Sequence, residues 1–475
     1  MRGWYAGLVH VVWDDRVRLS AAASVVLGGA PWRVLRIAPA GRDFVRRLAA
    51  AGPAGLVASP GIEQRLADLL LTRGIVHPVV AAAPPTPVDV IVPVYGSPDL
   101  LDECLTALRA ASPEAHVIVV DDGSPDGAVG DVALSHGATL LRHPVNRGPA
   151  AARNTGLRHA GTPLVAFVDA DCAVTPGWLG PLITHFDDPR VCAVAPRVRG
   201  RSGPGVLARY QSAHNALDMG PRPQLVVHGA PLGYVPSAAL VVRRAKCPAF
   251  DEDLRVGEDV DLIWRLTDGG ALVRYEPAVS VDHATRPTVP GWAARIADYG
   301  TSAVPLESRH PGRLAPARFS PWTLATAALL MTGKPAAAVV PVAAAGARVI
   351  RTLRASSVDA AVAPAVMATT ARADASAAGH LLRREWWPLG WLTLVLAWRS
   401  RTARAAGAAM LVPLVLEWFR QRPEVDLPRY VALRLTDDAA YGSGVIAAAV
   451  RSRRVGVLLP RLRRKAQKNP TALSL

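Results

Sequence analysis

Two carboxylates with the spacing of a metal site, Asp169 and Asp171, stand one residue apart at the end of an apolar run. In a β-strand alternate side chains share a face, so both groups can reach one hard divalent cation at the C-terminal end of the strand. Mg²⁺ or Mn²⁺ held in this way keeps open positions for phosphate oxygens. The same spacing also occurs in ordinary turns, so the pair predicts a metal site only together with its neighbours.

Two further apolar runs end in polar side chains, residues 88–94 at Tyr95 and residues 117–120 at Asp121 and Asp122. Leucines at helical spacing lie between them, which predicts a strand–helix–strand unit and hence a parallel sheet. Ligands in such sheets bind at the carboxyl ends of the strands, where all these groups are expected to meet. A turn or capping role before Gly123 is the alternative for the two acids.

Asp259 is the candidate general base. It follows Gly257 and Glu258 and precedes apolar residues at helical spacing, so it is expected at the start of a helix. A carboxylate positioned against a hydroxyl typically accelerates transfer by about 10²- to 10⁴-fold. The alternative role is an N-terminal helix cap.

Three other side chains are candidates for binding a charged ligand. Arg147 and Arg153 flank and enter a helix expected to begin near Gly148, where cations and free amides suit a diphosphate; a solvated helix face is the alternative. His283 ends an alternating apolar segment and is a candidate third metal ligand, since imidazole suits Mn²⁺. A structural role is its alternative.

Several motifs stand in the order seen in family 2 glycosyltransferases of the GT-A fold, and the resemblance covers about residues 86–310. The motifs are Val-Pro-Val-Tyr at 92–95, Asp-Asp-Gly-Ser-Pro-Asp at 121–126, the run at 146–156, the Asp169/Asp171 pair and Gly-Glu-Asp-Val-Asp-Leu at 257–262. The resemblance implies an α/β, Rossmann-like domain and an inverting hexosyltransferase that takes a sugar from a nucleotide diphosphate. The Gln-x-x-Arg-Trp motif of enzymes that make long polymers is absent from the sequence, so extended processive synthesis is not expected.

The resemblance also assigns roles to the candidate residues. It makes Asp259 the catalytic base and places Asp121 or Asp122 on the nucleobase or ribose. The nucleotide-sugar contacts it implies are Pro93, Tyr95, Asp121, Asp122, Arg147, Arg153 and Asp169, and the ligands for Mg²⁺ or Mn²⁺ are Asp169, Asp171 and His283.

Residues 1–83 are expected to form a small winged-helix-like α+β module. Short strands are predicted near residues 17–20, 24–27, 32–37 and 75–76, with helices at 40–50 and 62–72. Winged helices bind either peptides or nucleic acid. The arginines on the two helices are balanced by acids, which disfavours a phosphate-binding face. Binding of a peptide along an exposed strand edge, and no nucleic acid, is the prediction.

A module of this kind, a family 2 domain and a hydrophobic tail together are similar to the glycosyltransferases of mycofactocin biosynthesis. That resemblance implies transfer of glucose from UDP-glucose, in β-1,4 linkage, to a peptide-derived redox cofactor precursor. Two alternatives stay open. One is a glycosyltransferase acting on polyprenyl phosphate or another cell-envelope acceptor. The other is a non-catalytic carbohydrate- or peptide-binding scaffold at the membrane.

The predicted organisation is a module at 1–83, a linker at 84–87, the glycosyltransferase domain at 88–310 and a mostly helical region at 311–475. Apolar runs at 319–333, 335–346 and 386–398 are each shorter than a spanning helix needs, although the first two could span together if Lys334 faced a polar partner. With a net charge of +16 and a basic tail they favour membrane association, as interfacial helices or one span. A soluble helical bundle rich in Ala is the alternative. Four scattered cysteines indicate a reducing compartment, and Asp14 and Asp15 interrupt any signal-peptide pattern. The expected location is the cytoplasmic face of the cell membrane.

Overall fold

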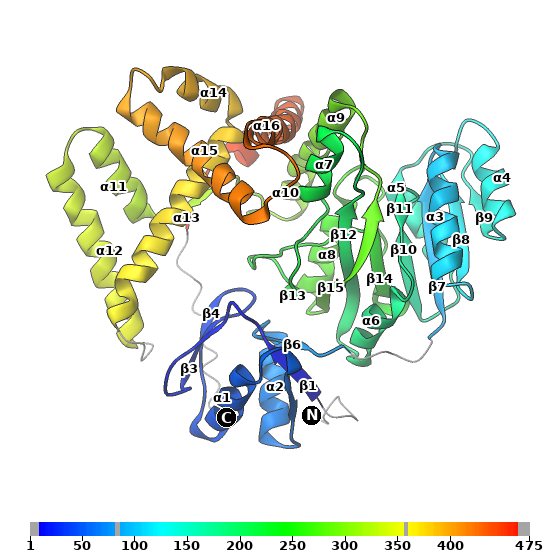
Figure 1. Cartoon of the computed structure of the whole chain (residues 1–475), viewed down its shortest axis with the longest axis horizontal. Helices are drawn as coiled ribbons and strands as arrows, with labels where there is room; N and C mark the ends of the chain where they lie inside the picture. Colours follow the sequence, from blue (N-terminus) through cyan, green and yellow to red (C-terminus); the bar gives the residue numbers. More distant parts are fainter. Residues whose placement is uncertain (1–8, 81–85, 356–359, 464–475) are drawn as a thin grey trace. The chain divides into compact units, whose positions relative to one another are not determined.

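The computed structural model describes residues 9–80, 86–355 and 360–463, and these form two compact units (Figure 1). The first unit takes in the described residues up to Ser202 together with His214–Thr285; the second takes in Gly203–Ala213 and the described residues from Arg286 onward. Residues 1–8 and 81–83 of the predicted module, residues 84 and 85 of the predicted linker, and Arg464, Lys465 and Lys468 of the predicted basic tail lie outside the described residues.

Within the described residues, the first unit is built on a nine-stranded mixed sheet in the order β11-β15-β12-β14-β10-β7-β8-β9, with β13 paired to β15. The strands are β7 (Val88–Val94), β8 (His116–Asp121), β9 (Thr139–Arg142), β10 (Leu164–Val168), β11 (Cys172–Ala173), β12 (Val191–Gly200), β13 (Gln224–Val226), β14 (Ala239–Arg243) and β15 (Leu272–His283). β7 pairs in parallel with both β8 and β10, and α3 (Pro98–Ala111) connects β7 to β8. The predicted parallel strand–helix–strand unit is therefore confirmed.

Helices cover both faces of this sheet (Figure 1). Successive side chains of β7 therefore pack alternately into two apolar clusters, one on each face. Val90 and Val92 pack with the leucines of α3, whereas Ile91 packs on the opposite face with α5 (Pro149–His159) and α8 (Glu258–Asp268). α5 approaches β7 closely at Gly156, where an added Cβ would lie 2.4 Å from Ile91 Cγ2. Only glycine fits that approach without moving the strand or the helix.

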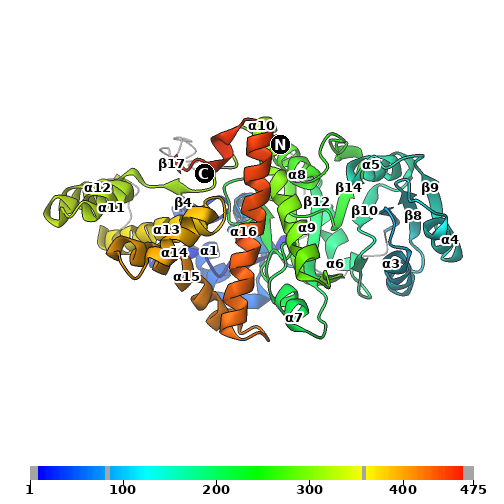
Figure 2. The same cartoon turned by 90° about the horizontal axis from the view of Figure 1, so that it is seen from above.

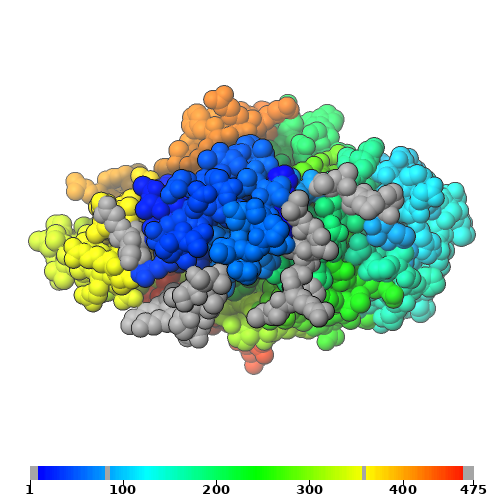
Figure 3. All heavy atoms as spheres, turned by 90° about the horizontal axis from the view of Figure 1, so that it is seen from below, coloured from blue at the N-terminus to red at the C-terminus, as the bar shows by residue number. Residues whose placement is uncertain are grey.

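The N-terminal module contains the strands and helices that the sequence predicts, plus two more strands. One described sheet has the order β2-β3-β4 and the other β5-β1-β6. Their bounds are β1 (Val9–Trp13), β2 (Arg18–Leu19), β3 (Val25–Gly28), β4 (Arg33–Arg36), α1 (Arg42–Ala50), β5 (Leu56–Ala58), α2 (Ile62–Thr72) and β6 (Val76–Pro78). Figure 3 shows the broad outer face of this module in blue. Arg190, after α6 (Leu179–Thr184), ties the module to the sheet domain because it pairs with Asp188 at 2.8 Å and with Asp68 of α2 at 2.5 Å.

The second unit is helical in the described part of the chain, apart from a two-residue parallel pair of β16 (Arg318–Phe319) and β17 (Arg461–Leu462). Its helices are α7 (Val206–Ala213), α9 (Val289–Thr301), α10 (Ala303–Arg309), α11 (Pro321–Met331), α12 (Pro335–Ala355), α13 (Ala363–Arg383), α14 (Trp387–Leu396), α15 (Arg401–Gln421) and α16 (Leu427–Arg451). Figure 2 shows α9 lying along α16, and an added Cβ on Gly300 would lie 2.1 Å from the Tyr441 carbonyl. The main stretch of the helical unit thus begins at Arg286, before the predicted boundary at residue 311, because α9 and α10 pack on α16.

Two helices of this unit, α12 and α15, are long and apolar enough to cross a membrane by length and composition, at 21 residues each. Few of their residues are buried within the described chain. The shorter helices α11 and α14 are also apolar.

Candidate functional site

The carboxyl ends of β8, β7 and β10 lie next to one another on the sheet, which brings most of the predicted site residues to one rim. Val94 and Asp121 are register partners at the ends of β7 and β8, and β10 runs in parallel on the other side of β7 before Asp169. Pro93 is buried in β7, whereas Tyr95 beyond the strand is 55% exposed. Of these two, only Tyr95 presents its side chain to solvent for a ligand.

The Asp122 carboxylate anchors the chain that leads into α5. It accepts hydrogen bonds from the backbone amides of Arg147 and Gly148, at 3.0 and 2.6 Å, and lies 2.7 Å from His143 Nδ1. The side chain is buried, with both oxygens engaged. In this structure Asp122 therefore holds the loop at Arg147 and Gly148, which is neither a nucleotide contact nor a turn before Gly123; its predicted nucleotide contact stays a prediction.

Asp121 is fully buried, but one of its oxygens has hydrogen-bonding capacity to spare. Oδ1 accepts from the Ser124 amide at 2.9 Å, and Oδ2 lies 3.5 Å from Arg142 Nε. Among the described residues Oδ2 accepts no hydrogen bond. A buried acceptor in this state costs about 1 to 3 kcal/mol unless a ligand or water satisfies it.

Arg153 is the central cation of the rim. It is 3% exposed and projects from α5, with Nη2 donating to Asp169 Oδ1 at 2.6 Å and Nη1 donating to Glu258 Oε1 at 2.7 Å. Phe250 packs against the guanidinium, 5.5 Å from its ring centroid. Burial opposes the charge, but Asp169, Glu258 and Asp259 together raise the pKa of Arg153. Arg153 thus links the strand that ends at Asp169 to the helix that begins at Glu258.

Arg147 differs from Arg153 in exposure and in partner. Its guanidinium is about half exposed, and Nη2 donates to Glu252 at 2.7 Å. Glu252 also accepts from Asn154 of α5, so the loop before α8 is attached to the start of α5 through two side chains. The predicted nucleotide contacts of Arg147 and Arg153 stay predictions; Arg147 is the one with access to solvent.

Asp259 lies at the start of α8, as the sequence predicts, next to the loop that leads into β14. Its Oδ2 accepts from the Ser237 amide at 3.3 Å, while the carbonyl of the next residue, Ala238, accepts from the Asp169 amide at 2.9 Å. Burial of the carboxyl group raises the pKa of Asp259, and Arg153 partly offsets this. Asp169 and Asp259, ninety positions apart, are therefore held by adjacent residues of one loop and interact electrostatically with the same guanidinium.

The proposed metal ligands come together in part. β11 pairs with β15 so that Cys172 faces His283, and this register places Asp171 Oδ2 at 3.4 Å from His283 Nε2. Asp169 lies on the same rim with Oδ1 on Arg153. Over the described ranges, no three His, Cys, Asp or Glu side chains gather closely enough to enclose an ion. Two or three oxygen and nitrogen donors with open positions nevertheless fit Mg²⁺ or Mn²⁺, which take their other ligands from water and phosphate.

Glu258 has a role that the sequence reasoning missed. It is buried and paired with Arg153, and burial together with the adjacent Asp259 raises its pKa to about 7. The signal for this role is Arg153 itself, because an arginine among alanines on a buried helix face must find an acid. Asn154 is the second residue missed: it bonds the backbone of Phe250 in both directions, at 2.8 and 2.9 Å.

Comparison with known proteins gives matches over the catalytic part and over nearly the whole chain. Residues 89–246 match the family model "Glycosyl transferase family 2". The chain is 38% identical over 469 residues to the "Pre-mycofactocin glycosyltransferase" of Mycobacterium tuberculosis, covering 95% of this chain and 97% of that protein. It is 29% identical to the "Succinoglycan biosynthesis protein ExoU" of Rhizobium meliloti, over 43% of this chain and 63% of that protein.

Among solved structures, the mannosyltransferase PcManGT from Pyrobaculum calidifontis, solved with GDP-Man and Mn²⁺, is 22% identical, with a TM-score of 0.38 over 72% of this chain and 89% of that chain. The fold class predicted from the sequence, an α/β domain of the GT-A type between a small α+β module and a helical region, is confirmed.

The titration of Glu258 gives a test of this arrangement. Its pKa is about 7 in the folded chain and 4.5 ordinarily, so the folded state binds more protons than the unfolded state between these values. The free energy of unfolding should therefore fall as pH rises from about 4.5 to 7, and Glu258→Gln should remove that fall, by roughly 1 to 3 kcal/mol. Urea unfolding of both proteins at pH 5, 6, 7 and 8 measures it. Parallel pH profiles of the two proteins would contradict the assignment.

Proposed function

Because the chain belongs to glycosyl transferase family 2 and, within it, to the family of the pre-mycofactocin glycosyltransferases, we propose that it moves a sugar from a nucleotide diphosphate to a peptide-derived acceptor. The sugar is glucose from UDP-glucose, joined in β-1,4 linkage, and the reaction inverts the anomeric carbon. The observation that carries this proposal is the junction at Ser237 and Ala238, which holds Asp259 and Asp169 at one site.

Inversion requires the acceptor hydroxyl to attack the anomeric carbon from the face opposite the leaving diphosphate. As the bond forms, Asp259 accepts the hydroxyl proton, and its raised pKa makes it a stronger base than an exposed aspartate. The charge of Arg153 favours the ionised form of Asp259. Through its hydrogen bonds to Glu258 and Asp169, Arg153 also holds the start of α8 against the end of β10.

Donor binding uses other residues of the rim. Asp121 Oδ2 is the acceptor available to an N–H of the nucleobase, and the exposed Tyr95 ring offers a stacking surface. Asp171 and His283, with the second oxygen of Asp169, would hold Mg²⁺ or Mn²⁺. When bound, the ion supplies Lewis-acid stabilisation of the charge that develops on the diphosphate.

The decisive variant is Asp259→Asn. We expect transfer from UDP-glucose in the presence of Mn²⁺ to fall by about 10²- to 10⁴-fold, because the base is lost, while UDP binding changes by less than about twofold. Mass spectrometry of the acceptor measures transfer, and calorimetry measures UDP binding. Asp253→Asn is the matched control, since Asp253 is an exposed acid of the loop before α8.

Three results would redirect the proposal. Loss of UDP binding in Asp259→Asn would give Asp259 a structural role instead. Absence of transfer and hydrolysis with any nucleotide sugar, despite UDP binding, would favour the non-catalytic scaffold, and transfer to polyprenyl phosphate alone would favour the cell-envelope alternative.

Asp171→Asn should weaken Mn²⁺ binding measured by calorimetry in the presence of UDP; unchanged binding would remove Asp171 from the ligand set.

Delivery of the acceptor is assigned to the N-terminal module. β4 is an edge strand of its described sheet, and Trp32 beside it is 66% exposed, which suits addition of an extended peptide strand with an aromatic anchor. The basic and acidic side chains on α1 pair with each other, as in Arg47 with Asp43 at 2.9 Å, which leaves little net charge for nucleic acid.

Trp32→Ala should therefore raise the KM for the peptide acceptor about tenfold with little change in kcat, because the anchor binds the substrate and not the transition state. Steady-state kinetics with varied acceptor measures both constants. Ile62→Ala, at another exposed apolar side chain of the module, is the control. An equal fall in kcat for Trp32→Ala, or no effect, would count against the delivery role.

Membrane association at the cytoplasmic face is assigned to the apolar helices of the helical unit. Most large apolar side chains exposed in the described chain lie there, including Val340 and Trp398 at 70% and Val395 at 66%. Exposed tryptophan beside arginine, as in Trp398 and Arg399, suits the interface of an anionic bilayer.

The purified chain should float with vesicles containing about 30% anionic lipid in a density gradient, and flotation should weaken as salt rises, because the attraction is partly electrostatic. Val395→Asp with Trp398→Asp should reduce flotation severalfold. Leu134→Asp, at an exposed leucine of the first unit, is the control. Equal flotation of all three proteins would contradict an interface at α14.

A further inference from the structure

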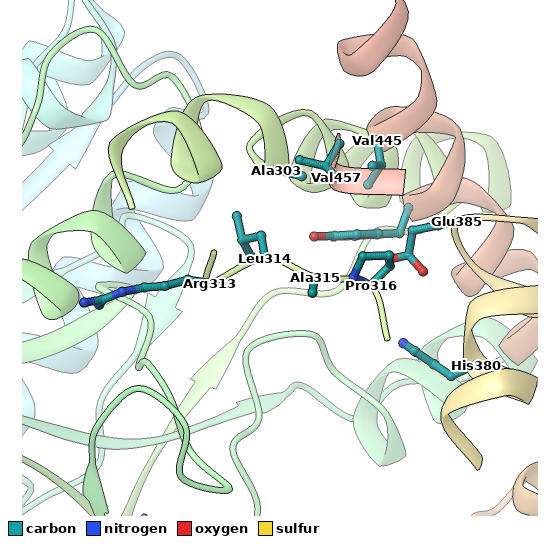
Figure 4. Close-up of a pocket in the computed structure, with 10 residues that line it drawn as sticks. Ala303, Arg313, Leu314, Ala315, Pro316, His380, Glu385, Val445 and Val457 are labelled. Atoms are coloured by element: carbon teal, nitrogen blue, oxygen red, sulfur yellow. The ribbon is translucent and has the colours of Figure 1, made fainter. Parts of the chain in front are cut away.

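The helical unit contains a cavity of about 200 Å³ that glycosyl transfer, as proposed, does not use. Its walls come from α10, the loop before β16, the end of α13, α16 and the 3-10 turn Val455–Leu458. The lining residues are Ala303, Arg313, Leu314, Ala315, Pro316, His380, Glu385, Tyr441, Val445 and Val457. Figure 4 shows Ala303, Val445 and Val457 at one end of the cavity and His380 toward the other.

Glu385 gives this cavity a polar wall with hydrogen-bonding capacity to spare. The residue is 8% exposed, and its Oε1 lies 3.7 Å from Arg384 Nε. Its Oε2 is buried and, among the described residues, has no hydrogen-bond donor. Burial raises the pKa of Glu385, which Arg384 only partly offsets. A buried carboxyl oxygen without a hydrogen bond costs free energy, so the cavity favours a ligand that carries a hydrogen-bond donor.

The charges around the cavity argue against an ionic ligand. Arg384 stacks on Tyr441, one of the lining residues, with 3.4 Å between the guanidinium carbon and the ring centroid, so an added cation would be repelled. Glu385 on the same wall would repel an anion. Burial, with Arg384, lowers the pKa of His380 to about 4, so its imidazole is neutral. Its Nδ1 accepts from Arg383 Nη2 at 3.4 Å, which leaves the Nε2–H as a donor. A neutral ligand that can both donate and accept satisfies these groups.

Size and the remaining walls narrow the ligand further. A cavity of about 150 Å³ takes benzene, so a cavity of about 200 Å³ takes one substituted six-membered ring. Leu314, Val445 and Val457 supply apolar surface for the C–H face of such a ring. Hydroxyl groups around its edge both donate and accept hydrogen bonds, as the polar wall requires.

We infer that this cavity is a second carbohydrate site, which binds one neutral hexose-sized ring through a hydroxyl that donates to Glu385. The site goes beyond the proposed transfer reaction, because none of its lining residues belongs to the rim that holds Asp259. It accounts for the buried Oε2 of Glu385, which meets no hydrogen-bond donor within the part of the chain that the structure describes.

The test uses the full chain with D-glucose and methyl β-D-glucopyranoside, and saturation-transfer NMR reports their binding. We expect saturable binding of roughly millimolar affinity. Ala315→Leu, which fills the cavity, and Glu385→Gln, which replaces one carboxyl oxygen by an amide, should each weaken binding about tenfold. Glu424→Gln, the same change at an exposed position of this unit, should leave it unchanged.

The outcomes separate this site from the catalytic one. Asp259→Asn should bind glucose as the unaltered chain does, so failure of the proposed transfer reaction leaves this test intact. No binding up to about 100 mM of either sugar, or binding that either cavity variant leaves unchanged, would overturn the inference. Circular dichroism and UDP binding establish that each variant is folded, and a cavity that holds only water would give the first of these results.

Discussion

The buried guanidinium of Arg153 is the interaction on which the site depends. A cation at 3% exposure is stable only because carboxylates on two sides compensate its lost hydration, one from the end of β10 and one from the start of α8. These acids are themselves buried or partly buried beside Asp259. Without the charge of Arg153 the three carboxylates would repel one another. The charge of one side chain thus holds together elements that come from distant parts of the sequence. Removing Arg153 would leave the acids without a compensating cation, and removing one acid would leave Arg153 with one carboxylate fewer.

The parts of the site that follow from local pattern could be predicted from the sequence. Apolar runs predict β7 and β8, because both faces of these strands are covered and their residues are mostly apolar. Leu262 and Leu266 at helical spacing predict that Asp259 lies at the start of α8. The module's two helices begin and end within two residues of the predicted positions. β1 and β5 were missed, although Val9 and Val11 alternate in burial with His10, because short strands give weak signals.

The parts that depend on long-range pairing could not be read in this way. The Arg153–Glu258 contact spans 105 positions, and no local period records it. The same holds for Asp122, which precedes a glycine. The local sequence does not distinguish a carboxylate that binds a ligand from one that, as here, accepts from the amides of Arg147 and Gly148. The start of the helical unit also depends on tertiary packing, because α9 lies along α16, about 140 positions later in the chain. Composition changes near residue 311, but contacts decide where a unit begins.

Arg190 fixes the N-terminal module to the sheet domain. One guanidinium serves Asp188 beside the catalytic sheet and Asp68 on α2, and Arg16 of the module also donates to Gln224 on β13, at 3.1 Å. A module held to the sheet domain by two side-chain contacts has little freedom to move relative to it, unlike a domain on a flexible tether. The entropic cost of positioning the module is therefore part of folding and is not incurred again when a substrate binds. Heating should accordingly melt the module and the catalytic sheet in one cooperative step, and the module should be a poor candidate for transplantation onto an unrelated enzyme.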